Sequence, residues 1–407
     1  MTFVLFLVTT CLNPKEQGYF FTFLSFAGLA QLFDFGLAYA SMQTASHYQV
    51  HKNTLRDLKH QVIRVSVFSC IVALPLVEVV GFFTLTRGGL DSSSDNSSWL
   101  IPWLVYIPVI LAGLPIAALL AIHEGGGAIG AVWRLRLNQE WIAGGILLVG
   151  LLSGMGLWSL VFSAGIRPII GWLWLILARS DHHTPLISSP QSQLPLVWRL
   201  DIWPFQWKIG LSFLCGFLIF KAIIPVVLFE RGEVVAGQIG LAISVMNAII
   251  AFSTAWPTSQ AARYGSLLAS KAYTMLKVEF QHALLWSTLL CAGTIICACA
   301  FLQTLKQFMP FITNRLPSFY VITLIFGAAI FHHTVICFAA PLRAERREPL
   351  LLSSVIGSMV TIIAIWLAAR YAGPLEIAIV NLICAAVGLP IAIYIFRRRL
   401  NSWISSG

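Results

Sequence analysis

Long apolar runs alternate with short polar breaks along the whole chain. A helix needs about 20 consecutive apolar residues to cross the hydrocarbon of a bilayer, and most of the runs approach that length. The pattern therefore predicts an all-α polytopic membrane protein with about twelve transmembrane helices. The runs cover residues 1–12, 19–42, 65–85, 99–121, 134–153, 157–178, 207–229, 234–257, 281–303, 317–340, 350–369 and 374–396.

The first run is too short to span a membrane. Residues 1–12 have no basic N-terminal region and no small-residue cleavage site, so they lack the features of a signal peptide. We expect them to be the second half of a first helix whose beginning is truncated.

The positions of the basic residues predict the topology. Of the 26 Lys and Arg residues, 18 lie in one set of alternate loops or at the adjoining ends of the runs, 6 lie in the other set, and two lie deep inside apolar runs. Lys and Arg are enriched in cytoplasmic loops. The first set, and with it both chain termini, is therefore predicted to be cytoplasmic, as in a multi-pass protein of a bacterial inner membrane. The net charge of +10 is then a topology signal rather than a nucleic-acid surface.

The longest break predicts two halves. It contains Pro185, Pro190 and Pro195 with a Ser/Gln-rich middle, which is typical of a flexible linker. We predict an N-terminal six-helix lobe at 1–180, a cytoplasmic linker at 181–206 and a C-terminal six-helix lobe at 207–407. Six spans in each half give both the same orientation. Weak self-similarity between 16–25 and 236–244 supports a parallel repeat.

Composition supports lipid as the solvent. Apolar residues make up 58% of the 407 and charged residues 10%, whereas soluble proteins have roughly 45–50% and about 25%. The eight cysteines lie in apolar segments without metal-ligand spacing. We therefore expect no metal site and no disulfide framework.

Several segments resemble one family of exporters. PKEQGY (14–19) followed by LFDFGL (32–37) is similar to the entry to the second helix of polysaccharide and O-antigen flippases, which belong to the multidrug/oligosaccharidyl-lipid/polysaccharide exporter superfamily. The matching segments of the second half are WPFQWK (203–208), VAGQIGL (235–241), AW (255–256), ARYG (262–265) and LRAERREP (342–349). Together the resemblance covers nearly the whole chain.

The resemblance implies a fold and a function. The fold would be two six-helix lobes around a central cavity that opens alternately to either side of the membrane. The substrate would be a lipid-linked oligosaccharide carried on polyprenyl pyrophosphate, for O-antigen or other polysaccharide biosynthesis. Membrane lipid, a polysaccharide polymerase and assembly proteins would be partners, and no cofactor is expected. The truncated first helix departs from the family and would leave one wall of the cavity incomplete.

Two cations inside apolar runs are candidates for binding the substrate phosphates. Lys221 lies about two-thirds along 207–229, and Arg167 lies near the middle of 157–178. A charge at mid-span costs about 2.5–3.5 kcal/mol on insertion scales, so it usually faces a partner or a water-filled cavity. By resemblance the span of Lys221 lines the cavity. For Arg167 the sequence favours a structural ion pair.

The other candidates are acidic or neutral. Asp34 and Glu78 could bind a coupling cation or proton, or pair with basic residues. Gln238 and Asn247 could bond sugar hydroxyls or neighbouring helices, which is the commoner use of such residues in membranes. His332 and His333 point about 100° apart on a helix, which favours a helix–helix contact over a shared metal site.

Two other functions stay open. A multidrug/cation antiporter of the same superfamily would prefer an acidic cavity, whereas Lys221 and Arg167 are basic. A membrane polysaccharide polymerase or glycosyltransferase typically carries its catalytic residues on a large outer loop. The longest outer loop here, 86–98, is short and rich in Gly, Ser, Asp and Asn, so a non-enzymatic transporter is favoured.

Overall fold

The structure, a computed structural model, describes residues 2–47, 52–88, 98–177, 203–308, 315–344 and 349–406. Within these ranges the regular elements are helices and no strand occurs, which confirms the all-α prediction. The helices are α1 (Thr2–Cys11), α2 (Pro14–Leu32), α3 (Leu37–His47), α4 (Lys52–Gly88), α5 (Leu100–Leu111), α6 (Gly113–Gly125), α7 (Ile129–Leu152), α8 (Trp158–Leu177), α10 (Trp203–Phe220), α11 (Ile223–Ser259), α12 (Ala261–Ala269), α13 (Tyr273–Phe308), α14 (Phe319–Ala344), α15 (Leu351–Tyr371) and α16 (Pro374–Ser406).

The apolar helices confirm a multi-pass membrane protein. Eight described stretches are long and apolar enough to cross a membrane, and nine if the bent pair α2–α3 is counted as one span. One of the eight, Gln206–Leu268, has 63 residues and contains two of the predicted runs. A straight helix of that length would be about 95 Å long, but the chain leaves helical geometry at Gly232, where φ is 79°. The predicted count of twelve stays a prediction.

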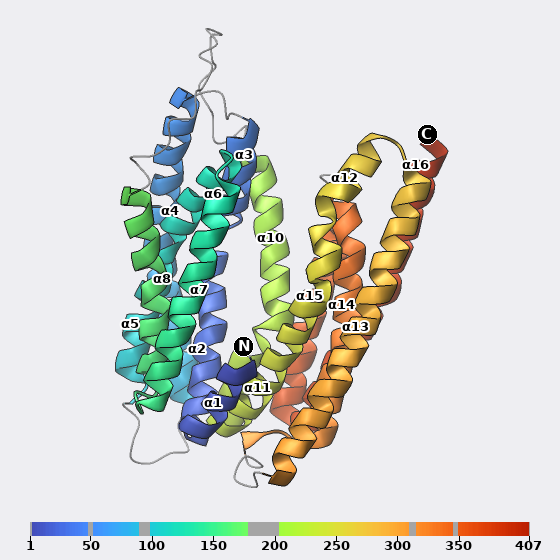
Figure 1. The fold of residues 1–407 in the computed structure, drawn as a ribbon. Coiled ribbons are helices and arrows are strands. Elements are labelled where there is room, and N and C mark those ends of the chain that lie inside the picture. Colours follow the sequence, from blue (N-terminus) through green and yellow to red (C-terminus); the bar gives the residue numbers. More distant parts are fainter. Residues whose placement is uncertain are drawn as a thin grey trace. The chain divides into compact units, whose positions relative to one another are not determined.

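The chain forms two compact units. Residues 3–217 make one, and residues 218–407 with 1–2 make the other; within each unit, taken by itself, long helices pack side by side (Figure 1). Most of α10 therefore belongs to the first unit, although the sequence assigns it to the second lobe. Its close packing explains this, because a Cβ added at Gly210 would come within 3.0 Å of the Phe35 carbonyl oxygen. The predicted linker 181–206 lies largely outside the described residues.

The first unit is built around a bent helix and an aromatic cluster. α2 and α3 meet at 47°, and the chain turns between them with positive φ at Phe35 and Gly36. Along α2, Phe23 and Phe26 pack on the buried Trp103 of α5 with ring centroids 5.2 and 5.1 Å apart. Aromatic pairs at these separations add to the stability gained from burial alone. The cluster therefore fixes α2 against α5.

The second unit has its own apolar core. Phe280 of α13, Phe338 of α14 and Phe396 of α16 are buried, with ring centroids 4.7–5.3 Å apart. At the far end of the unit, Arg231 of α11 donates to the backbone carbonyls of Ala369 and Ala372. These carbonyls lie at the C-terminal end of α15 and have no partner within that helix. Arg231 therefore joins α11 to α15, and its guanidinium is occupied by these two carbonyls.

The close approach of α3 and α6 gives a test of packing. A Cβ added at Gly125 would lie 2.1 Å from the Met42 carbonyl oxygen, whereas a Cβ at Gly113, in the same helix, meets nothing within 4 Å. A backbone oxygen cannot rotate away as a side chain can. We expect Gly125→Ala to destabilise the protein by at least about 1–3 kcal/mol and to lower its abundance in the membrane. Gly113→Ala is the matched control, and equal abundance of the two variants would contradict this packing.

Candidate functional site

A proline breaks the helix next to Lys221. Pro225 has no N–H to donate to the carbonyl of Lys221 four residues earlier, and its ring crowds that carbonyl. α10 accordingly ends at Phe220, residues 221–222 form a turn, and α11 begins at Ile223. The Ile224 N–H turns to the Lys221 carbonyl, at 3.4 Å, instead of to Phe220. The break therefore follows directly from the sequence around Pro225.

Asn247 bonds the carbonyl that the break leaves free. Its Nδ2 donates to the Phe220 carbonyl oxygen at 3.5 Å, so one turn of α11 binds the end of α10. A backbone carbonyl without a partner is costly in a membrane, and the amide of Asn247 reduces that cost. Asn247 and Lys221 therefore lie at the same break, and their role in substrate binding stays a prediction.

Lys221 is the unpaired cation of this site. Its side chain is exposed, and its ammonium makes no ion pair or hydrogen bond with any residue that the structure describes. Ten residues, or about 15 Å of helix, separate it from Arg231 near the end of the span, which is more than a lysine side chain can reach. An ammonium at this depth requires water or an anionic ligand.

The two adjacent histidines have different surroundings. The His332 ring packs edge-on against Phe220, with centroids 4.8 Å apart. His333 is buried, and its Nδ1 lies 3.1 Å from Ser253 Oγ of α11 while its Nε2 lies 3.5 Å from Thr288 Oγ1 of α13. His333 therefore makes a polar contact between three helices, and His332 packs beside the Lys221 break.

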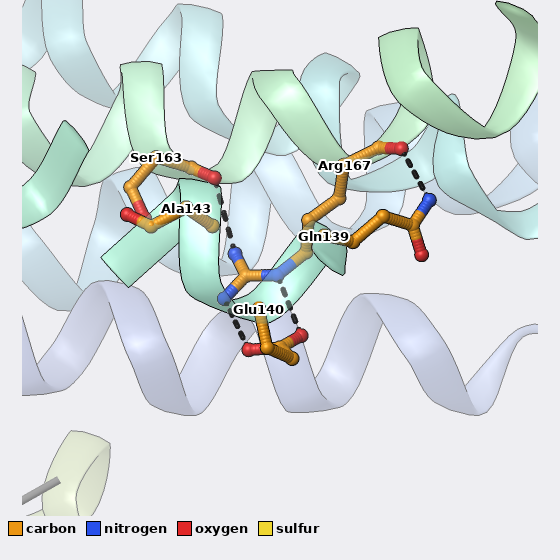
Figure 2. A network of polar contacts seen from close by, with 5 residues as sticks. All are labelled: Gln139, Glu140, Ala143, Ser163 and Arg167. Atoms are coloured by element: carbon orange, nitrogen blue, oxygen red, sulfur yellow. Dashed lines mark hydrogen bonds and ion pairs between the residues drawn. The ribbon is translucent and has the colours of Figure 1, made fainter. Parts of the chain in front are cut away.

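Arg167, the other intramembrane cation, is held by a carboxylate. Its Nε and one terminal nitrogen each lie 2.9 Å from an oxygen of Glu140, and the other terminal nitrogen donates to the Ser163 carbonyl (Figure 2). Gln139 donates to the Arg167 carbonyl at 2.7 Å. The network joins α7 to α8. It supports the structural role that the sequence favours for Arg167, and its substrate role stays a prediction.

The pair gives a charge-neutralisation test. Within an apolar span, removal of one partner leaves a lone charge, which costs about 2.5–3.5 kcal/mol on insertion scales. We expect Glu140→Gln to lower the abundance of inserted protein, and Glu140→Gln with Arg167→Gln to restore most of it. Membrane abundance is measured by immunoblotting. No recovery in the double variant would show that the pair itself is not what stabilises α7 against α8.

The two acidic candidates lie in the first unit, each with one oxygen that lacks a partner. Asp34 sits in the break between α2 and α3, and its Oδ2 accepts the Ala38 backbone N–H at 3.1 Å. Its Oδ1 and the Oε2 of Glu78, on α4, are buried and have no hydrogen-bond partner among the described residues. Oxygen atoms of this kind are suited to a cation or a proton.

Gln238 does not join Asn247. The two residues are nine positions apart on α11, which places them on opposite faces of a helix. Two other polar residues escaped the sequence analysis. Glu140 lies inside a predicted span, and Asn381 of α16 is buried with neither amide atom bonded to a described residue. Each could have been found in the sequence as a single polar residue within an apolar run.

These features define a class of protein: an all-helical, multi-pass membrane protein with two compact units, a helix broken beside a cation, and carboxylates with oxygens that have no partner among the described residues. Solved structures that are similar to it include transporters. An inward-facing multidrug resistance MATE transporter of the MOP superfamily matches with a TM-score of 0.58 and 14% identity over 98% of this chain and 96% of that chain.

Two further structures are similar at the same level. The lipid II flippase MurJ, in an inward closed conformation, matches with a TM-score of 0.60 and 12% identity over 97% of this chain and 85% of that one. A eukaryotic MATE transporter matches with a TM-score of 0.60 and 12% identity over 99% and 98%. No family model and no curated protein sequence matches the chain. The chain therefore has the fold that MATE transporters and MurJ share.

Proposed function

We propose that the chain is a flippase that moves an undecaprenyl-pyrophosphate-linked oligosaccharide from the cytoplasmic to the outer leaflet of a bacterial inner membrane, by alternating access. The observation that carries this proposal is Lys221 at the break between α10 and α11, whose ammonium has no ion pair or hydrogen bond among the described residues. The similarity to MurJ, a lipid II flippase, agrees with a lipid-linked substrate.

The chemistry of the substrate explains the need for a cation. A pyrophosphate carries negative charge that cannot cross hydrocarbon without a partner, because a charge in a low-dielectric medium is strongly destabilised. An ammonium contributes a compact positive charge and three donors. Lys221 would bind the phosphates, Asn247 would donate to them or to a sugar hydroxyl, and Gln238 would bond the glycan elsewhere on the path.

Asp34 and Glu78 would supply the coupling. Each has a buried oxygen without a hydrogen-bond partner among the described residues, so a proton or a monovalent cation would satisfy it. Binding and release of that cation would bias the protein between its conformations, because a ligand shifts an equilibrium by its different affinity for the two states.

The same carboxylates favour a second candidate function, the export of cationic drugs. MATE transporters are similar to the chain at the level at which MurJ is, and buried carboxylates attract organic cations. Under this alternative Asp34 and Glu78 would contact the substrate, and Lys221 would repel it. The two functions therefore predict opposite effects of the charge at residue 221.

Ligand binding to the purified protein distinguishes transport of a lipid-linked oligosaccharide from export of cationic drugs. We expect a water-soluble prenyl pyrophosphate sugar to bind, and Lys221→Ala to weaken it by at least about tenfold, since hydrogen bonds to charged groups contribute about 1.5–3 kcal/mol. Binding of the cationic dye ethidium should be absent or weak. Tight ethidium binding that strengthens in Lys221→Ala, with no binding of the pyrophosphate, would favour drug export instead.

A further inference from the structure

The last helix has two different faces where it leaves the apolar run. Phe396, Leu400 and Trp403 of α16 are buried in the core of the second unit. Tyr394, Arg398 and Ser402 follow one another at intervals of four residues and are exposed. Because four residues are close to one helical turn, these three side chains form a stripe on the face away from the core.

This stripe borders a cavity. A cavity of about 550 Å³ lies between one face of α16 and Pro349, two residues before α15 begins, a size typical of small-molecule sites. The residues that line it are Pro349, Tyr394, Ile395, Arg398, Arg399 and Ser402. Neither Arg398 nor Arg399 makes an ion pair or a side-chain hydrogen bond with any residue in the described part of the chain.

From the sequence, we infer that this cavity lies at the level of a membrane surface. It begins where the apolar run 374–396 ends and three arginines follow. Tyrosine is enriched at this level, where its ring meets the acyl chains and its hydroxyl meets the headgroups. Its lining combines two guanidinium groups and the Tyr394 hydroxyl, which suit an anionic headgroup, with the apolar side chains of Ile395 and Pro349.

We propose that this cavity binds the headgroup of an anionic phospholipid. The two guanidinium forks match the oxygens of a phosphodiester, Tyr394 supplies a hydroxyl for a glycerol headgroup, and Ile395 contacts the first carbons of the acyl chains. The Ser402 hydroxyl donates to the Arg399 carbonyl at 2.7 Å. Basic pockets between transmembrane helices are known to bind such headgroups. The site is separate from Lys221 and does not depend on which substrate is transported.

Arg397 provides a matched control. It is exposed, carries the same charge one residue away, and does not line the cavity. General attraction between an anionic membrane and basic residues would be weakened equally by neutralising any of the three arginines. A specific binding site would lose lipid affinity only when Arg398 or Arg399 is neutralised.

Native mass spectrometry of the full-length protein, titrated with phosphatidylglycerol in detergent, tests the proposal. We expect one phosphatidylglycerol to bind in preference to phosphatidylcholine, and Arg397→Gln to leave this affinity unchanged. Arg398→Gln with Arg399→Gln should weaken it roughly twentyfold or more, at about fivefold for each arginine. Arg398→Lys with Arg399→Lys, which keeps the charge for folding and topology, should lose part of the affinity because lysine has no fork.

Three outcomes would overturn it. Equal losses in Arg397→Gln and in the double variant would show general electrostatic attraction. Displacement of the lipid by millimolar glycerol 3-phosphate would show a site for a free anion. Retention of undecaprenyl phosphate but not of phosphatidylglycerol would assign the cavity to the transported lipid.

Discussion

Replacing Lys221 by alanine is expected to lower glycan export at least tenfold while leaving the amount of inserted protein unchanged. Lys221 has no ionic partner among the described residues, so its removal leaves no stranded charge and should not destabilise the fold. What the variant loses is the positive charge opposite the substrate phosphates, at about 1.5–3 kcal/mol for hydrogen bonds to charged groups. Surface glycan and membrane abundance are measured in the same cells, in a strain whose glycan depends on this gene.

Two further variants give the Lys221 experiment its controls. Lys221→Arg should retain much of the export, because it keeps the charge. Lys208→Ala removes the same charge from the other end of α10, where the ammonium lies over the Trp207 ring, and should export normally. Full export from a well-inserted Lys221→Ala protein would rule out phosphate binding by this residue.

Replacing Asp34 by asparagine is expected to abolish coupled export, again without loss of protein. The asparagine carbonyl can still accept the Ala38 N–H that Asp34 accepts now, so the first turn of α3 keeps its bond. The negative charge that would hold a proton or cation is lost. Export is measured as the initial rate under an imposed ion gradient.

Asp34→Ala separates structure from charge. It removes the bond to Ala38 as well as the charge, and a lost bond of this kind at a helix start costs about 0.5–2 kcal/mol. We expect lower abundance in Asp34→Ala than in Asp34→Asn, and no export in either. Gradient-driven export by Asp34→Asn at the wild-type rate would contradict a coupling role.

Apolar run length and breaks were enough to predict the helical fold. The chain leaves helical geometry at Gly232, between the predicted runs 207–229 and 234–257, because glycine there adopts a φ that other residues avoid. The bend between α2 and α3 was not predicted. It depends on a positive φ at Phe35, which is uncommon for a residue with a Cβ and is stabilised by tertiary contacts that no local pattern reveals.

The ion pair of Arg167 could have been predicted from the sequence. α7 and α8 are consecutive helices joined by a glycine turn at Gly154, so residues equally far from the turn lie side by side. Glu140 is fourteen residues before the turn and Arg167 thirteen after it. The partner of Arg167 follows from that count alone.

The contact of Asn247 with the Phe220 carbonyl could not have been predicted from the sequence. Pro225 predicts a bend and a freed carbonyl at Lys221, but not that the Ile224 N–H takes this carbonyl and leaves the carbonyl of Phe220 to a side chain. Asn247 is 27 residues away in sequence, on a segment separated from α10 by the kink at Gly232. The angle of that kink decides which face of α11 meets the break.

Transport by the purified protein in vesicles tests the central claim most directly. The vesicles carry a fluorescently labelled undecaprenyl-pyrophosphate oligosaccharide, and a membrane-impermeant quencher reports how much label reaches the opposite leaflet. We expect the labelled lipid to change leaflet faster in vesicles with the wild-type protein than in protein-free vesicles. Lys221→Ala should return the rate to that of protein-free vesicles, and ethidium should not be transported. If the wild-type protein transports ethidium, and the labelled lipid moves no faster than in protein-free vesicles, the flippase function is contradicted.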